Sequence, residues 1–139
     1  MTAQGAQMPE ISTLLPVRAE APAMARRFLS WFIAEALPSE MREDAALLTS
    51  EVVTNSVRHA GRSADDGIGM ELTLSDDHLR VSVTDDGPGF EPDLDAPPRE
   101  RAMGGFGLVL VDRISDRWGV IRDRPNVVWF ELDRRTTVS

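Results

Sequence analysis

The chain has 139 residues and a mass of 15.3 kDa, which is the size of one domain, and 42% of its residues are hydrophobic. It contains no cysteine, which excludes a disulfide scaffold and a thiolate metal site, and no lysine, which excludes a lysine-based phosphate loop. The formal charge of −8 disfavours contact with nucleic acid or an anionic membrane. We therefore expect no direct nucleic-acid partner. Because neither a signal peptide nor a membrane-length apolar stretch is recognisable, we also expect a cytoplasmic protein with no membrane span.

Hydrophobic periodicity predicts a single domain over residues 9–139, preceded by a flexible tail at residues 1–8. The first expected elements are a strand at 11–17, a helix at 19–37 and a second helix at 39–61. Then follow a hairpin of strands at 67–75 and 79–83, a helix at 108–114, and strands at 118–122 and 127–132. This order is typical of an α+β fold, a two-layer sandwich with helices on one face of a mixed, mostly antiparallel sheet.

The first predicted helix is amphipathic. Its apolar residues at helical spacing are Ala23, Phe28, Trp31, Phe32 and Ala36. We expect this face to point towards the core, and the helix to end before Pro38.

The second predicted helix carries Glu51, Asn55 and His59 at intervals of four residues. They therefore share one face of the helix, beside Leu48 and Val52. A carboxylate and an amide buried without partners are unfavourable, so this face either points to solvent or binds a ligand. In the first alternative the core contacts another stripe of the helix. That stripe contains Leu47, Val53 and Val57.

Asp85 is expected at the end of the hairpin, just before Gly87 and Gly89. Its carboxylate can accept a hydrogen bond from an exocyclic amine, and the glycines allow the backbone to approach a flat ligand closely. The alternative is an ordinary turn, since Asp-Gly-Pro-Gly is strong turn chemistry.

A glycine-rich run immediately precedes the third predicted helix. It consists of Gly104, Gly105, Phe106, Gly107 and Leu108. Free backbone amides and the positive end of the helix dipole can bind a phosphate there without a lysine. The alternative is a flexible hinge that leads into a buried helix.

The three motifs occur together and in a characteristic order. Glu51 and Asn55 are similar to the N box of the GHKL superfamily of ATPases and kinases, and Asp85-x-Gly87-x-Gly89 resembles its G1 box. Its G2 box is matched by Gly105-x-Gly107-Leu108. The stretch 49–60 and the short layout resemble the RsbW and SpoIIAB group of anti-sigma factor serine kinases. The resemblance covers nearly the whole chain and implies the Bergerat-type ATP-binding fold.

The resemblance implies a role for each matched residue, with ATP and Mg²⁺ as cofactors. Asn55 would be a ligand of Mg²⁺, and Glu51 would be the catalytic residue that orients or deprotonates the attacking hydroxyl. Asp85 would accept from the adenine amino group, and Gly87 and Gly89 would pass against the ring. The remaining nucleotide-binding positions are Arg58, His59, Gly104, Gly105, Phe106, Gly107 and Leu108.

Two further segments bear on the site. Residues 91–103 fall where the superfamily has its ATP lid, and Arg99 and Arg101 there either reach the terminal phosphate or are simply solvated. Relatives often carry Gly-x-Thr before the final strand, whereas this chain has Pro125, Asn126 and Val127. We expect the missing threonine hydroxyl to weaken one contact near adenine.

The resemblance also implies the partners. The chain would be a serine/threonine protein kinase that phosphorylates an anti-sigma factor antagonist, a STAS-domain protein, and sequesters a sigma factor. A homodimer is usual among such relatives. The alternative is a non-catalytic ATP-binding module that acts through protein interaction alone. A sensor histidine kinase is excluded because the chain has no room for a dimerising helical hairpin.

Overall fold

The computed structural model of the chain describes residues 9–60, 67–85, 106–122 and 125–134. The predicted tail at residues 1–8 lies outside them. The elements are β1 (Glu10–Leu15), α1 (Ala21–Ile33), α2 (Ser39–Ala60), β2 (Ile68–Leu74), β3 (His78–Asp85), α4 (Phe106–Ile114), β4 (Arg117–Arg122) and β5 (Asn126–Asp133). Each predicted helix and strand is present, with boundaries that differ by a few residues.

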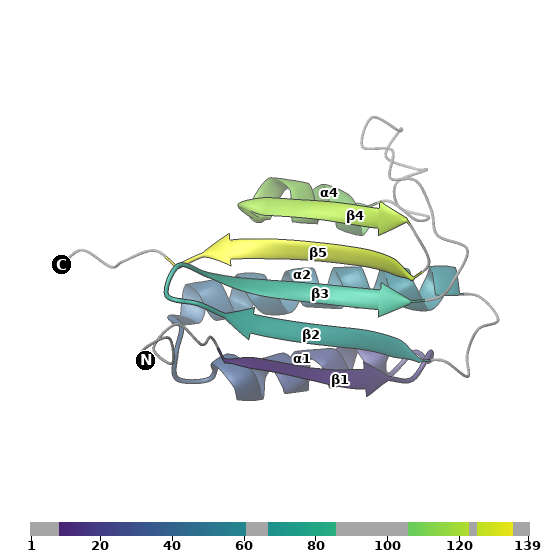
Figure 1. Ribbon diagram of the computed structural model, residues 1–139, viewed down its shortest axis with the longest axis horizontal. Coiled ribbons are helices and arrows are strands. Elements are labelled where there is room, and N and C mark those ends of the chain that lie inside the picture. Colours follow the sequence, from purple (N-terminus) through teal and green to yellow (C-terminus); the bar gives the residue numbers. More distant parts are fainter. Residues whose placement is uncertain (1–8, 61–66, 86–105, 123–124, 135–139) are drawn as a thin grey trace, which may run out of the picture.

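The strands form one sheet in the order β1-β2-β3-β5-β4, and the helices cover one of its faces (Figure 1). This is the predicted α+β two-layer sandwich. Every described strand pair is antiparallel, so the sheet is not mixed as expected. The reason is local, because β2 and β3 form one hairpin, β4 and β5 form another, and β1 joins the edge of the first in the antiparallel sense.

The core lies between the helices and the inner face of the sheet. Along β5 the residues alternate, so that Val128, Phe130 and Leu132 point inward while the residues between them point outward. From α2, Leu48, Val52 and Val53 are fully buried against this layer. Leu47 is exposed, so the stripe expected to contain Leu47 and Val53 does not exist as one buried face.

The predicted apolar face of α1 is confirmed only in part, because Phe28 and Phe32 are partly buried and pack against the core, whereas Trp31 and Ala36 are exposed. The buried residues of this helix are Ala21, Ala25, Leu29 and Ile33, which are spaced by four. Two alanines on this stripe, Ala21 and Ala25, are fully buried, and their small side chains let the helix approach its neighbours closely. Trp31 is 70% exposed and stacks on Phe28 at the edge of the helix layer, with 6.4 Å between ring centroids.

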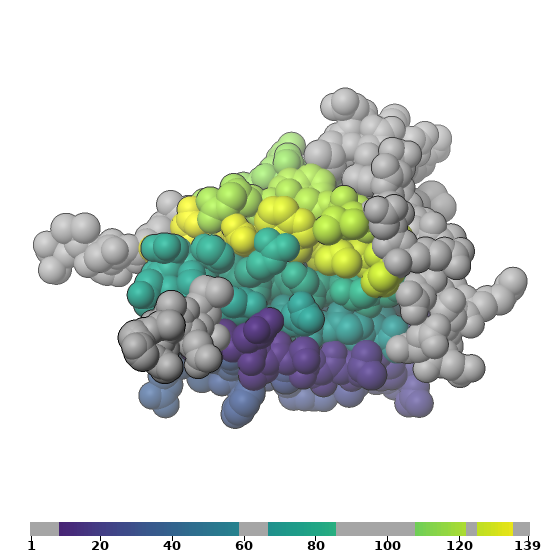
Figure 2. Space-filling model, viewed as in Figure 1, coloured from purple at the N-terminus to yellow at the C-terminus, as the bar shows by residue number. Residues whose placement is uncertain are grey.

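The second face of the sheet is formed by strand side chains alone among the described elements, as Figure 2 shows. The bands of β1, β2, β3, β5 and β4 follow one another across this face. In the described ranges, each helix is too short or too polar to span a bilayer.

Candidate functional site

Three elements bring the predicted site residues to one end of the molecule. The C-terminal end of α2, the C-terminal end of β3 and the start of β5 all lie at the right-hand end of Figure 1. α2 packs against β3 and also against α4. Asn55, Asp85 and Asn126, which are separated by 30 and by 41 positions in the sequence, therefore belong to elements that meet at this end of the two layers.

Asn55 lies on the inner side of α2. Its side chain is 4% exposed, and the neighbouring Val52 and Ser56 are buried as well. The alternative of a solvent-facing helix stripe is therefore wrong for Asn55. Glu51, one turn earlier, is partly buried, while Arg58 is exposed. The backbone of His59 is within α2, but its side chain lies outside the described part of the structure.

The amide of Asn55 is incompletely satisfied. Its Nδ2 is buried and finds no hydrogen-bond partner in the described structure. An unpaired buried polar group destabilises a fold by about 1–3 kcal/mol, so such a group in a native protein calls for an explanation. Rotation of the amide by 180° exchanges nitrogen and oxygen, and an amide oxygen is a suitable ligand for Mg²⁺. The chemistry of this position therefore fits a ligand that supplies a cation.

Asp85 ends β3 with its side chain buried, at 7% exposure. Directly opposite on β5 lies Asn126, equally buried, and its Nδ2 donates a hydrogen bond to Asp85 Oδ1 at 3.4 Å. A buried carboxylate that keeps an amide donor beside it is suited to accept a further hydrogen bond from a ligand amine.

Asn126 is a candidate site residue to which the sequence pattern gave no role. The departure from the family was assigned to Val127, but Val127 pairs with Thr84, and the alternation of β5 turns it to the other face of the sheet. The polar side chain at this end of β5 is therefore supplied by Asn126. The signal that could have found it is its even spacing from Val128 and Phe130, which are buried.

α4 begins earlier than expected. Phe106, Gly107 and Leu108 belong to its first turn rather than to a preceding loop, and Leu108 is fully buried in the core. Leu108 therefore presents only its backbone to a ligand, and the backbone amides of a first helical turn have no partner within the helix. The predicted residues Gly87, Gly89, Gly104, Gly105, Arg99 and Arg101 lie outside the described residues.

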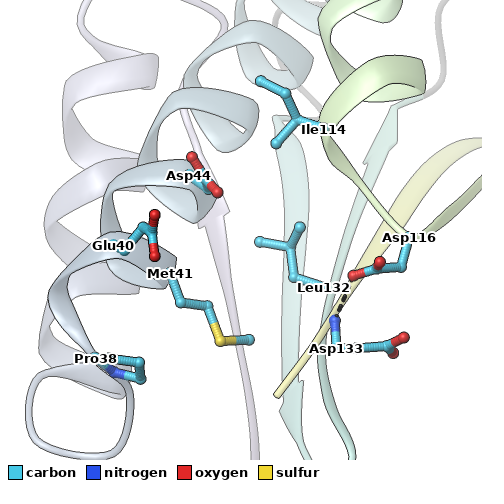
Figure 3. A pocket seen from close by; sticks show the side chains of 8 residues that line it. All are labelled: Pro38, Glu40, Met41, Asp44, Ile114, Asp116, Leu132 and Asp133. Atoms are coloured by element: carbon cyan, nitrogen blue, oxygen red, sulfur yellow. Dashed lines mark hydrogen bonds between the residues drawn. The ribbon is translucent and has the colours of Figure 1, made fainter. Parts of the chain in front are cut away.

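One pocket formed by described residues lies elsewhere. It has a volume of about 360 Å³ and sits at the N-terminal end of α2, away from Asn55 (Figure 3). Its apolar walls include Met41, Ile114 and Leu132. Four carboxylates also line it, and one of them, Asp116, accepts a hydrogen bond from the backbone of Asp133 at 2.7 Å. A pocket lined by carboxylates is unsuited to phosphates.

Comparison with known proteins identifies the family to which the chain is similar. A profile of the histidine kinase-like ATPase domain matches residues 15–132. The serine-protein kinase RsbW of Listeria monocytogenes serotype 4a (strain HCC23) is 33% identical over 121 residues, which are 77% of this chain and 76% of the relative. The serine-protein kinase RsbW of Staphylococcus epidermidis is 28% identical over 127 residues, which are 81% of this chain and 79% of that relative.

Solved structures agree on the fold. The structure of the RsbU and RsbW domains of Rv1364c from Mycobacterium tuberculosis matches 92% of this chain with a TM-score of 0.69 and 20% identity. This chain spans 33% of that longer chain. The family profile covers both layers of the fold, including Asn55, Asp85 and the start of α4. The chain belongs to the histidine kinase-like ATPase family, in the branch of its RsbW relatives.

Proposed function

We propose that the chain is an ATP-dependent protein serine/threonine kinase that regulates a sigma factor. The observation that supports this most directly is the buried Nδ2 of Asn55, which has no hydrogen-bond partner in the described structure and lies at the same end of the fold as the buried carboxylate of Asp85. A buried polar atom without a partner destabilises a fold, and a ligand that completes the site explains its presence. The similarity to RsbW serine-protein kinases supports Mg-ATP as that ligand.

Each residue has a defined task towards the nucleotide. Asp85 accepts a hydrogen bond from the adenine amino group, and the oxygen of Asn55 is the protein ligand of Mg²⁺. The backbone amides at the start of α4, including those of Gly107 and Leu108, bind phosphate oxygens. Gly87, Gly89, Gly104 and Gly105 are assigned to the nucleotide by the family resemblance. When bound, ATP would supply the phosphoryl group, and Mg²⁺ would neutralise part of the charge on its phosphate oxygens.

Glu51 is the residue that we assign to proton transfer. It lies one helical turn before Asn55 and is partly buried, so it combines access to a substrate with a fixed position. Glu51 orients the serine hydroxyl of the substrate protein and takes the proton that this hydroxyl loses during phosphoryl transfer. The hydroxyl oxygen would then form the new bond to the γ-phosphorus while the bond between that phosphorus and the β–γ bridging oxygen breaks, and ADP would leave with that oxygen.

The partners we propose are a sigma factor and an antagonist protein of the STAS type, with the kinase acting as a possible homodimer. Phosphorylation adds about −1.5 to −2 charges to the antagonist at pH 7. The kinase itself carries a formal charge of −8, so electrostatic repulsion favours release of the phosphorylated product. The released kinase is then available to hold the sigma factor.

The test distinguishes binding of Mg-ATP from transfer of its phosphate to a protein substrate. The Glu51→Gln variant should bind Mg-ATP with the affinity of the unsubstituted protein, measured by calorimetry, and should lose transfer of labelled phosphate to a purified antagonist by at least a hundredfold. Transfer that survives this substitution would remove Glu51 from the mechanism. Mg-ATP binding without any transfer by the unsubstituted protein would instead favour the non-catalytic interaction module.

A further inference from the structure

We propose that Asn126 is a positioning residue that orients the carboxylate of Asp85 and thereby sets the selectivity of the nucleotide site for adenine over guanine. This inference rests on the proposed function. Nothing in the family match or in the matched motifs assigns a role to Asn126, and the family pattern expects a threonine hydroxyl near this position. The structure supplies an amide instead, at a position where it contacts Asp85.

The contact between Asn126 and Asp85 follows from the pairing of β5 with β3. Asn126 and Asp85 are paired residues at the ends of β5 and β3, so the backbone ladder sets the distance between their side chains. The hydrogen bond from Asn126 Nδ2 to Asp85 Oδ1 measures 3.4 Å, and both side chains are 7% exposed. Because water is largely excluded, the orientation of the carboxylate depends on protein donors rather than on solvent.

The chemistry of a neutral donor suits this task. A carboxylate has two oxygens with about four acceptor positions, so a bond from Asn126 leaves acceptor capacity for a ligand. The adenine 6-amino group donates to that capacity, whereas guanine presents a 6-oxo group, which is itself an acceptor and is repelled. A side chain fixed in the orientation that it has in the complex loses less rotamer entropy on binding. Asn126 therefore strengthens the binding of adenine nucleotides and has little effect on the weak binding of guanine nucleotides. The selectivity for adenine rises by the same factor as the adenine affinity.

Val127 offers a matched control. It is the adjacent residue of the same strand, but it lies on the opposite face of the sheet and pairs with Thr84. Substitution of Val127 disturbs β5 to a similar degree without changing a donor to Asp85.

The experiment measures dissociation constants for Mg-ATP and Mg-GTP by calorimetry, with no need for catalytic turnover. We expect Asn126→Ala to weaken ATP binding about tenfold, as for loss of a hydrogen bond to a charged group, and to leave GTP binding within about twofold. The ATP:GTP preference should fall by the same factor. Asn126→Thr keeps a hydroxyl donor and should restore most of the preference, whereas Val127→Ala should leave it unchanged.

Asn126→Leu is the second decisive variant, because it keeps the approximate volume of the side chain but has no donor and adds no charge beside Asp85. We expect it to bind ATP at least as weakly as Asn126→Ala, and this comparison with Asn126→Thr stands even if the alanine variant does not fold. Equal loss of ATP and GTP binding, or an unchanged ATP affinity in Asn126→Leu, would show a merely structural role and overturn the inference alone. Absence of nucleotide binding by the unsubstituted protein would overturn the proposed function as well.

Discussion

Glu131 Oε1 accepts a hydrogen bond of 2.6 Å from Nε of Arg117, its partner across the β4–β5 ladder. Oε2 of the same carboxylate accepts from Arg80 Nη1 at 3.0 Å and lies 3.4 Å from Nε2 of His78. Glu131 is 13% exposed, so it is the least exposed member of this cluster on the open face of the sheet. Burial by itself raises the pKa of Glu131, but the hydrogen bonds from Arg117 and Arg80 outweigh it and hold this pKa below its ordinary value.

The first prediction concerns Glu131→Gln. A folded-state pKa below the unfolded value means that the ionised carboxylate stabilises the fold, fully above about pH 4.5, and that this stabilisation is lost as the pH falls through the folded pKa. We expect the variant to be about 1–2 kcal/mol less stable at pH 7, a value reduced by the partial exposure of both arginines. Urea unfolding at pH 7 and at decreasing pH should show the difference shrinking in acid.

Glu71→Gln is the control for this measurement, because Glu71 is an exposed carboxylate on β2. Its stability should change by less than 0.5 kcal/mol at every pH. A difference between Glu131→Gln and the unsubstituted protein that persists or grows below pH 4 would contradict the assigned role of the ionised carboxylate.

The second prediction concerns Gly119→Ala. Gly119 lies opposite Trp129 on the ladder, and a Cβ atom at this position would lie 2.8 Å from the indole Nε1. The ring would have to move, and with it the stack in which the guanidinium carbon of Arg80 lies 4.2 Å from the ring centroid. We expect a loss of about 1–3 kcal/mol in the free energy of unfolding, together with a change in tryptophan fluorescence.

Gly69→Ala is the matched glycine substitution on the same sheet. A Cβ atom there would meet the side chain of Thr84 at 3.6 Å, which is ordinary van der Waals contact. This variant should keep the stability and the fluorescence of the unsubstituted protein. If both variants were equally destabilised, loss of stability could not be attributed to the contact with Trp129.

The positions of the strands along the chain were predictable from short apolar or alternating runs bounded by turn residues. The same logic could not identify the buried face of α1, since Trp31 and Phe28 fit a helical stripe as well as Ala25 and Leu29 do. Which stripe is buried depends on how closely the neighbouring layer approaches, and this is a property of the packed fold.

The candidate site was predictable in part. Asn55 and Asp85 could be selected because their residue types are unusual at those positions of a helix and a strand. Asn126 could not, because its importance depends on the register that places it opposite Asp85. The ion-pair cluster around Glu131 was likewise hidden, because Arg80 lies 51 residues away in sequence and is brought close only by the pairing of β3 with β5.

The last prediction uses two buried polar groups of α2 that lack hydrogen-bond partners in the described structure, Asn55 Nδ2 and Thr49 Oγ1. Asn55→Ala removes an amide whose Nδ2 is unpaired and introduces a better helix former, so the free protein should be as stable as before or gain up to about 1 kcal/mol. Mg-ATP at a hundred times its dissociation constant should add about 2.7 kcal/mol to the unsubstituted protein, and this gain should be largely lost in the variant.

Thr49→Val separates the two effects, since it also removes an unpaired buried hydroxyl while preserving the shape of the side chain. Its stability without ligand should rise by a similar amount, and its stabilisation by Mg-ATP should be unchanged, as thermal unfolding with and without nucleotide would measure. If Asn55→Ala lowered the stability of the free protein by 2 kcal/mol or more, the amide would have to contribute to the packing of α2. If it kept the full response to Mg-ATP, the unpaired amide would have no part in nucleotide binding.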